Sequence, residues 1–230
     1  MLQVALLKTA AEEHLLLFNM HHIISDGWSM GILVSELGQL YTACASGDVA
    51  PLSVLPVLDI QYKDYAAWQS SQLEEESTIG ALRNYWKTQL HALPTLDLPT
   101  DYVRPLVKSY SGARVQHVLP LELSNQLQAL SEGSGASLFM TLTALVNLLL
   151  YRYTGQQDIV LGTPSAGRRH PALHDQIGFY INTLVLRTQM EDGMTFEELL
   201  AVVKTTSLAA FEHELYPFDR LWRSSICRGT

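Results

Sequence analysis

The sequence predicts a mixed α/β protein in which sheets and helices are layered. Two observations support this fold class. Short apolar runs with the length of β-strands alternate along the chain with longer segments whose apolar residues recur at helical spacing. Glycine and proline residues, which favour turns, separate many of these segments. The 230 residues are long enough to bury a core.

The amino-terminal part begins with two expected strands, residues 4–7 and 15–20, which are apolar and separated by a polar turn. A helix should begin near Ser29, because apolar residues follow it at helical spacing, and Gly47 should end it. The next two helices are expected over residues 60–70 and 78–91.

The stretch around residue 105 is interrupted by prolines, so we divide the chain there into residues 1–105 and 106–221. After this point we expect a helix that begins after Ser137 and is buried on all sides, and a last helix that begins at a capping box of Thr195 and Glu198. The other elements expected here are a strand over 113–119, a helix over 124–131, and strands over 159–161 and 181–187.

Composition argues against several classes of protein. The net charge of −8 argues against a nucleic-acid-binding surface, which needs a basic patch. The most apolar stretch, residues 138–151, has about 14 residues where ~20 are needed to span a bilayer, so we predict no membrane segment. Cys44 and Cys227 lie far apart and form no CxxC pair, which favours a reducing, cytoplasmic location.

The most informative stretch is the sequence HHIISDG from His21 to Gly27. If both histidines end a strand, they point to opposite faces, so one faces a cleft and the other points into the protein body. Asp26 lies beyond the strand end, where its carboxylate can hold the loop, and Gly27 permits a backbone bend. The following helix then presents free N–H groups near the histidine.

A base beside the start of a helix is what acyl transfer requires. The competing interpretation is that a histidine at a strand end is structural, as is more often the case on spacing alone. A metal site is a third possibility, because histidine and aspartate are metal ligands. However, strand neighbours face opposite ways and no HExxH motif or cysteine cluster is present, so we predict no metal.

Four motifs in order resemble those of nonribosomal peptide synthetase condensation domains. Residues 20–29, MHHIISDGWS, resemble the HHxxxDG signature with its usual flanks. Residues 62–68, YKDYAAW, are similar to YxDYAxW, and residues 177–183, IGFYINT, are similar to IGxFVNT. Residues 213–219, HELYPFD, are similar to HQDxPFE, with Leu215 where an aspartate is common. Each later motif is weak alone, whereas four in order over nearly the whole chain are specific.

The resemblance implies a two-lobed, layered fold like that of chloramphenicol acetyltransferase, with a tunnel between the lobes and both lobes incomplete in this chain. It implies that an acceptor amine attacks a donor thioester directly, which forms an amide without a serine or cysteine nucleophile. Both substrates would arrive on the 4'-phosphopantetheine arms of peptidyl carrier protein domains, beside an adenylation domain. No cofactor of its own, no nucleic acid and no membrane are expected.

The resemblance also suggests roles for individual residues. His22 would line the tunnel as a general base or as a positioning group, and both roles suit an imidazole near pH 7. The N–H of Gly27 would approach the reacting oxygen, while His21 would support the site. Trp28 and Ser29 are tunnel candidates.

Asn182 is a further tunnel candidate, because an amide among apolar neighbours needs a partner, either in the tunnel or in the backbone. Asp26 would pair with a buried arginine that keeps the loop in place. Arg168 is our candidate for that partner, and three other arginines stay open: Arg152, Arg169 and Arg187.

The chain also departs from the family pattern. The earliest and the last family motifs are not found, so residues 1–105 would be the back of an amino-terminal lobe and 106–221 the front of a carboxy-terminal lobe. Residues 222–230, WRSSICRGT, do not resemble the family, and a single-base deletion after the codon of Leu221 would explain them. The isolated chain should then be poorly folded and inactive, with the helix from Leu138 exposed.

Other classes stay open beside amide synthesis. An inactive truncated remnant is one, and a related epimerisation domain or a coenzyme A-dependent acyltransferase is another. An epimerisation domain usually carries serine before tryptophan after the motif, whereas here Trp28 precedes Ser29. A heterocyclisation domain usually replaces both histidines by aspartate and is disfavoured.

Overall fold

The computed structural model describes residues 1–103, 105–107 and 109–223. Residues 224–230 of the expected non-familial tail lie outside the described residues. Two compact units make up the chain, and both are discontinuous in sequence. The first unit comprises Met1–Arg83, Pro164–Thr183 and Leu215–Pro217, and the second comprises Asn84–Thr163, Leu184–Glu214 and Phe218–Thr230.

The expected division near residue 105 falls inside the second unit. A division by proline content cannot find the true arrangement, because residues 164–183 return to pack with the first unit. The assignment of 1–105 and 106–221 to two family lobes stays a prediction.

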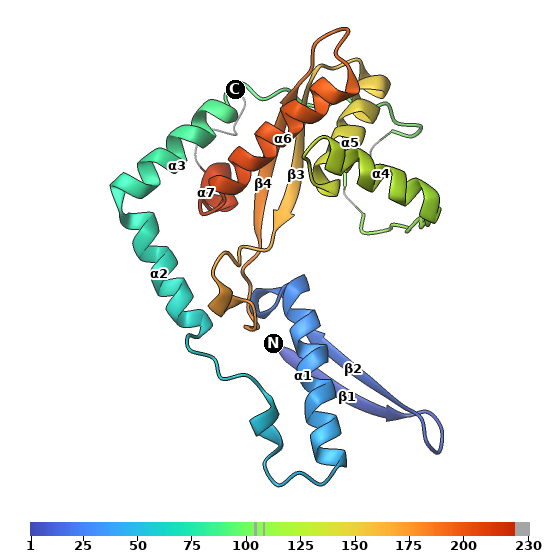
Figure 1. Cartoon of the computed structure of the whole chain (residues 1–230), viewed down its shortest axis with the longest axis vertical. Helices are drawn as coiled ribbons and strands as arrows, with labels where there is room; N and C mark the ends of the chain where they lie inside the picture. Colours follow the sequence, from blue (N-terminus) through green and yellow to red (C-terminus); the bar gives the residue numbers. More distant parts are fainter. Residues whose placement is uncertain (104, 108, 224–230) are drawn as a thin grey trace. The chain divides into compact units, whose positions relative to one another are not determined.

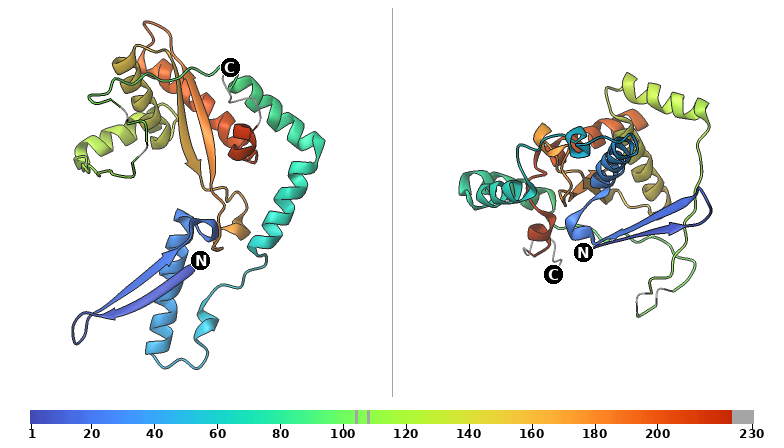
Figure 2. Two further views of the ribbon diagram at one scale, coloured as in Figure 1. Left: turned by 180° about the vertical axis from the view of Figure 1, so that it is seen from behind. Right: turned by 90° about the horizontal axis from the view of Figure 1, so that it is seen from below.

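The first unit opens with an antiparallel hairpin of β1 (Leu2–Lys8) and β2 (His14–Met20). Leu2 pairs with Met20 and Lys8 with His14, and the N–H of Thr9 donates to the carbonyl of Glu13 across the turn at 2.9 Å. Figure 2 shows the two strands side by side in both views. These bounds confirm the two strands expected from the apolar runs.

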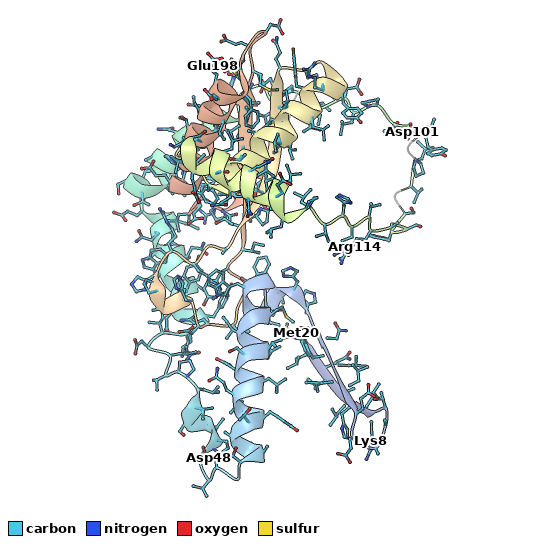
Figure 3. The ribbon with its side chains drawn as sticks, turned by 45° about the vertical axis from the view of Figure 1, so that its right-hand side comes forward. Lys8, Met20, Asp48, Asp101, Arg114 and Glu198 are labelled. Carbon is cyan, nitrogen blue, oxygen red and sulfur yellow. The ribbon has the colours of Figure 1, made fainter. Side chains whose placement is uncertain are left out.

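Both faces of this hairpin carry apolar side chains. Val4 is 60% exposed and Leu7, which points to the other face, is 47% exposed. Lys8 marks the turn end and Met20 the opposite end in Figure 3, where side chains project from both sides of the ribbon. A hairpin of this kind is typical of the interior of a larger, covered sheet.

A short 3-10 turn, η1 (His22–Ile24), links β2 to helix α1 (Gly27–Ala45), drawn in blue in Figure 1. Asp26 caps the helix, and Gly47 follows it with a φ of +75°, which agrees with the predicted stop. The remaining elements of the first unit are η2 (Pro51–Val54), α2 (Tyr62–Glu74), the start of α3 (Glu76–Gln89) and η3 (Pro171–Leu173).

The second unit contains α4 (Leu121–Gly133), α5 (Leu138–Thr154), α6 (Phe196–Glu212), α7 (Phe218–Arg223), and most of the paired strands β3 (Asp158–Ser165) and β4 (Asn182–Gln189). Its core joins α5, α6 and β3, with Ala144 and Ile159 fully buried. The predicted capping box begins α6, because the N–H of Thr195 donates to the Glu198 carboxylate at 2.8 Å and the Thr195 hydroxyl accepts from the N–H of Glu198.

Two predictions for the second unit were wrong. Residues 113–119 form no strand and are exposed, because a strand needs a neighbour to complete its hydrogen bonds, and periodicity does not supply one. Helix α5 is not buried on all sides. It buries Met140 and Ala144, but Val146 is 43% exposed and Leu149 is 53% exposed. This open face is what the sequence led us to expect of an incomplete domain.

Among the described residues, no single helix combines the length and apolar character needed to cross a membrane. Helices α4 and α5 meet these criteria only together, as a pair bent by 102°.

Candidate active site

The two histidines do not lie on a strand, which corrects the alternation argument. β2 ends at Met20, and His21 caps the 3-10 turn that follows. Nδ1 of His21 accepts the N–H of Ile23 at 3.1 Å, and the residue is exposed instead of pointing into the protein body. A polar side chain can make its hydrogen bond within a tight turn. His21 therefore caps the turn instead of supporting the site from the protein interior, as we had expected it to.

His22 is exposed, and its imidazole makes no hydrogen bond within the described part of the chain. Its ring contacts Phe179 edge to face, with 5.4 Å between ring centroids and 81° between planes. Both ring nitrogens are therefore free to meet another molecule.

The carboxylate of Asp26 organises the start of α1. Oδ1 accepts the N–H of Ser29 at 2.8 Å and lies 2.7 Å from its hydroxyl, while Oδ2 accepts the N–H of Tyr180 at 3.1 Å. Arg168 completes the site, with Nη2 3.3 Å from Oδ1. The side chains of the ion pair are 3% and 1% exposed, so the pair is shielded from water.

Burial by itself raises the pKa of Asp26, but the hydrogen bonds from Ser29 and Tyr180 and the charge of Arg168 outweigh it. The net result is a pKa below the ordinary value of 3.8, so the carboxyl is ionised at neutral pH. The ionised carboxylate accepts from the N–H groups of Ser29 and Tyr180 and from Arg168, and so ties the start of α1 to residues far along the chain.

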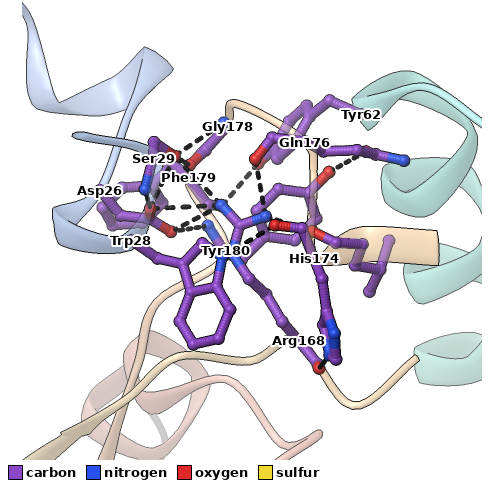
Figure 4. Close-up of polar contacts among 11 residues, drawn as sticks. Asp26, Trp28, Ser29, Tyr62, Arg168, His174, Gln176, Gly178, Phe179 and Tyr180 are labelled. Atoms are coloured by element: carbon purple, nitrogen blue, oxygen red, sulfur yellow. Dashed lines mark hydrogen bonds and ion pairs between the residues drawn. The ribbon is translucent and has the colours of Figure 1, made fainter. Parts of the chain in front are cut away.

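Arg168 is the arginine that pairs with Asp26, whereas Arg187 pairs with Asp158 at 2.6 Å in the second unit. The Nη1 atom of Arg168 donates to the carbonyls of Gln176, at 2.7 Å, and of Leu173. The predicted ion pair is therefore present (Figure 4). Its contribution to catalysis stays a prediction.

Ser29 was expected to line the tunnel, and the structure corrects this. The residue is fully buried, and its hydroxyl accepts from the N–H of Gly178 at 3.1 Å and from Arg168 at 3.1 Å. The carbonyl of Gly178 and the Asp26 carboxylate compete for its one proton, at 2.9 and 2.7 Å. A buried hydroxyl with this many partners ties segments together and does not meet a substrate.

Gly27 is the first residue of α1 and does not adopt a positive φ. A Cβ built on it meets nothing within 4 Å. The expected need for a glycine bend is therefore wrong, because Asp26 makes the turn into the helix in extended conformation. The other expectation for Gly27, that its N–H approaches the reacting oxygen, stays a prediction. That N–H is among the first N–H groups of the helix.

The two other tunnel candidates differ in exposure. Trp28 is 48% exposed, its indole N–H donates to the carbonyl of His174 at 2.8 Å, and it lines an open hollow of about 550 Å³ in the first unit. Asn182 is half-buried. Its amide donates to the carbonyl of Tyr216 at 2.9 Å and accepts from the N–H of Thr183, and both of these partners are backbone groups.

Sequence reasoning missed the aromatic and amide residues that complete this network. The hydroxyl of Tyr62 donates to the carbonyl of Phe179 at 2.9 Å, and the hydroxyl of Tyr180 donates to the side-chain carbonyl of Gln176. Burial raises the pKa of Tyr62 and of Tyr180, so both hydroxyls keep the proton that they donate. One signal was available: Gln176 is a lone amide before an apolar run, and it is 2% exposed.

Two glycines permit the close approach of these groups. Gly167 has a φ of +65°, and a Cβ there would lie 2.1 Å from the carbonyl oxygen of Tyr180. At Gly178 a Cβ would lie 2.5 Å from a ring carbon of Tyr62 and 2.8 Å from one of Tyr180. The close packing at Gly178 therefore leaves no room for a side chain.

The site thus consists of an exposed imidazole on a short turn, directly before a helix whose start is fixed by a buried ion pair. Within the described residues, no group of three or more histidine, cysteine, aspartate or glutamate side chains could hold a metal ion. A free base beside helix N–H groups suits proton transfer and the stabilisation of a developing negative oxygen. Acyl transfer is a class of reaction that uses both of these functions.

Comparison with known proteins agrees with this class. The family model described as Condensation domain matches residues 1–228. One of the linear gramicidin synthase proteins from Brevibacillus parabrevis is 46% identical over 222 residues, which are 96% of this chain and 3% of that protein.

Two solved structures share the fold. The X-domain from teicoplanin biosynthesis has a TM-score of 0.85 and 26% identity, and the match covers 99% of this chain and 50% of that chain. The first condensation domain of the calcium-dependent antibiotic synthetase, in complex with substrate analogue 3a, has a TM-score of 0.71 and 24% identity. This match covers 96% of this chain and 48% of that chain.

The chain belongs to the condensation-domain family of nonribosomal peptide synthetases and has the family's mixed α/β, chloramphenicol acetyltransferase-like fold. It spans about half of these two solved chains and 3% of the gramicidin synthase protein. The family match extends to residue 228 and so includes most of the tail. The frameshift stays a prediction that the nucleotide sequence tests.

Proposed function

We propose that this chain is part of an enzyme that forms amide bonds between a carrier-bound donor thioester and a carrier-bound acceptor amine. The observation that carries the proposal is the His22 imidazole, which is exposed and makes no hydrogen bond to any described residue, on a turn next to a buried ion pair. Membership of the condensation-domain family supports it.

In the proposed reaction the acceptor nitrogen attacks the thioester carbonyl carbon. A C–N bond forms, the C–S bond breaks, and the donor arm leaves as a thiolate. His22 accepts the proton of the attacking amine, or accepts a hydrogen bond that orients it, and the proton ends on the thiol. The N–H of Gly27 and the positive end of α1 would stabilise the negative charge that develops on the carbonyl oxygen.

The substrates we propose come on 4'-phosphopantetheine arms, so the enzyme needs no cofactor of its own. Its partners would be peptidyl carrier protein domains for donor and acceptor and an adjacent adenylation domain. We place it in the cytoplasm, where the free, exposed Cys44 would stay reduced.

We also propose that the 230 residues act only as part of a longer chain. The hairpin exposes apolar side chains on both faces, and α5 exposes a further apolar face. Exposed apolar surface of this kind marks contacts with other parts of a protein. The alternative of an inactive remnant predicts that even the complete domain forms no amide.

The test uses the complete domain that contains this chain, with synthetic donor and acceptor thioesters on carrier proteins. His22→Ala should lower the single-turnover rate by about 10²–10⁴-fold, the usual contribution of a general base. His21→Ala is the matched control, because His21 only caps a turn, and should keep the rate within about threefold. Equal rates for the wild type and His22→Ala would refute the assignment.

A further inference from the structure

Three consecutive residues of the segment after Gln176 have their backbone held by different side chains. The N–H of Gly178 donates to the Ser29 hydroxyl at 3.1 Å, and the carbonyl of Gly178 lies 2.9 Å from the same hydroxyl oxygen. The N–H of Tyr180 donates to Asp26 at 3.1 Å. Between them, the carbonyl of Phe179 accepts the hydroxyl of Tyr62 at 2.9 Å (Figure 4). This stretch is therefore fixed from both α1 and α2.

Tyr62 is the residue that holds the middle of the stretch. It is the first residue of α2, and its ring packs against the backbone at Gly178, where a Cβ would come within 2.5 Å. The ring also meets Tyr180 edge to face at 5.1 Å. Its hydroxyl donates to the carbonyl of Phe179, which lies 117 residues later in the sequence. This contact is therefore tertiary and not part of the helix.

The side chain of Phe179 is presented by this fixed backbone to His22. The two rings meet at 5.4 Å and 81°, so the edge of one ring faces the plane of the other. Within the described residues the His22 side chain makes no hydrogen bond, and Phe179 supplies the aromatic ring that contacts its imidazole. A histidine usually owes its orientation to a hydrogen bond at the second ring nitrogen.

We propose that Phe179, held in place by Tyr62, positions the His22 imidazole for the reaction. The inference rests on the proposed function of His22 and adds two positioning residues to it. A ring contact orients the imidazole while leaving both nitrogens available, so that one can meet the amine and the other can lose or gain a proton to solvent. Positional errors of about 1 Å in such groups can cost about 10²-fold in rate.

The experiment measures kcat and KM of amide formation for variants of the complete domain. Phe179→Leu, which keeps an apolar side chain but loses the ring, should lower kcat by about 10–100-fold with KM nearly unchanged. Phe179→Tyr should retain the rate, because the residue is 37% exposed and a hydroxyl can reach water.

Tyr62→Phe removes one hydroxyl and should lower kcat by about three- to tenfold. Tyr151→Phe is the matched control, since it loses a hydroxyl that donates to Asp192 at 3.1 Å in the second unit, and should leave kcat unchanged. Thermal melting checks that each variant is folded. The NMR signals of the His22 ring give a readout independent of activity, because the loss of the Phe179 ring should shift them.

The decisive comparison adds Phe179→Leu to His22→Ala. If Phe179 acts through His22, the double variant should be no slower than His22→Ala alone. Additive losses would overturn the positioning role. A slow His22→Ala beside a wild-type rate for Phe179→Leu would overturn it as well, while sparing the proposed function. A wild-type rate for His22→Ala would overturn both.

Discussion

Removal of the Asp26 carboxylate tests the anchor of the site. In the complete domain, Asp26→Ala would leave the guanidinium of Arg168 buried without its counter-charge, which costs about 3–5 kcal/mol when one partner of a buried pair is lost. The same carboxylate caps α1, and loss of such a cap costs about 0.5–2 kcal/mol. Because both costs come from the same carboxylate, they do not add in full, and we expect a total loss of stability of about 4 kcal/mol.

A loss of this size is a large part of the usual stability of a domain, so Asp26→Asn provides a milder variant. Its amide oxygen can still accept the N–H of Ser29, but the negative charge facing Arg168 is gone. We expect Asp26→Asn to lower the free energy of unfolding by about 1.5–3 kcal/mol, the range for a hydrogen bond to a charged group. Urea unfolding of both variants measures the loss as a shift in midpoint at constant slope. Midpoints equal to that of the wild type would refute the buried-pair reasoning.

The pH dependence of stability gives an independent check on the same carboxyl. The pKa of Asp26 is lowered in the folded state, so its contribution is complete above the unfolded value and declines as pH falls below 3.8 through the folded pKa. The wild type should therefore lose more stability than Asp26→Asn as the pH is lowered through this acid range. Parallel unfolding curves for the two proteins would contradict this.

Three further predictions concern backbone fit, capping and exposed surface in turn. Gly178→Ala should destabilise the complete domain by about 1–3 kcal/mol, because its Cβ would overlap the ring of Tyr62, whereas Gly27→Ala, with open space around it, should change the melting temperature little. Thr195→Ala should cost about 1 kcal/mol in urea unfolding through loss of the α6 cap, and an unchanged midpoint would contradict this. The isolated 230-residue chain should bind an apolar dye and melt broadly, and a sharp melt with amide-forming activity would overturn this.

The elements that sequence predicted best are those whose cause is local. Capping by Thr195 and Glu198 involves residues three apart, and the apolar runs of the hairpin need only a turn between them. Predictions failed where the cause was distant or absent from the pattern. Residues 113–119 alternate like a strand without a neighbour to pair with, and His21 was assigned to a strand that ends one residue earlier.

The candidate site shows the same contrast. The pairing of Asp26 with a buried arginine was expected from the family resemblance, which left other arginines open beside Arg168. The hydrogen bond from Tyr62 to Phe179 could not be predicted, since the sequence around neither residue specifies a contact 117 residues away. Ser29 was misjudged because a hydroxyl at a helix start looks the same whether it faces a substrate or a buried guanidinium.

The distance in sequence between the two halves of the anchor has a consequence for engineering. Asp26 and Ser29 depend on Arg168 and Gly178, which lie 142 and 149 positions later in the chain. A chimera that takes one half from this chain and the other from a relative would join groups that were never selected to fit. Cut points outside this unit keep the set together, so exchanged segments should carry residues 20–29 and 164–183 from a single parent.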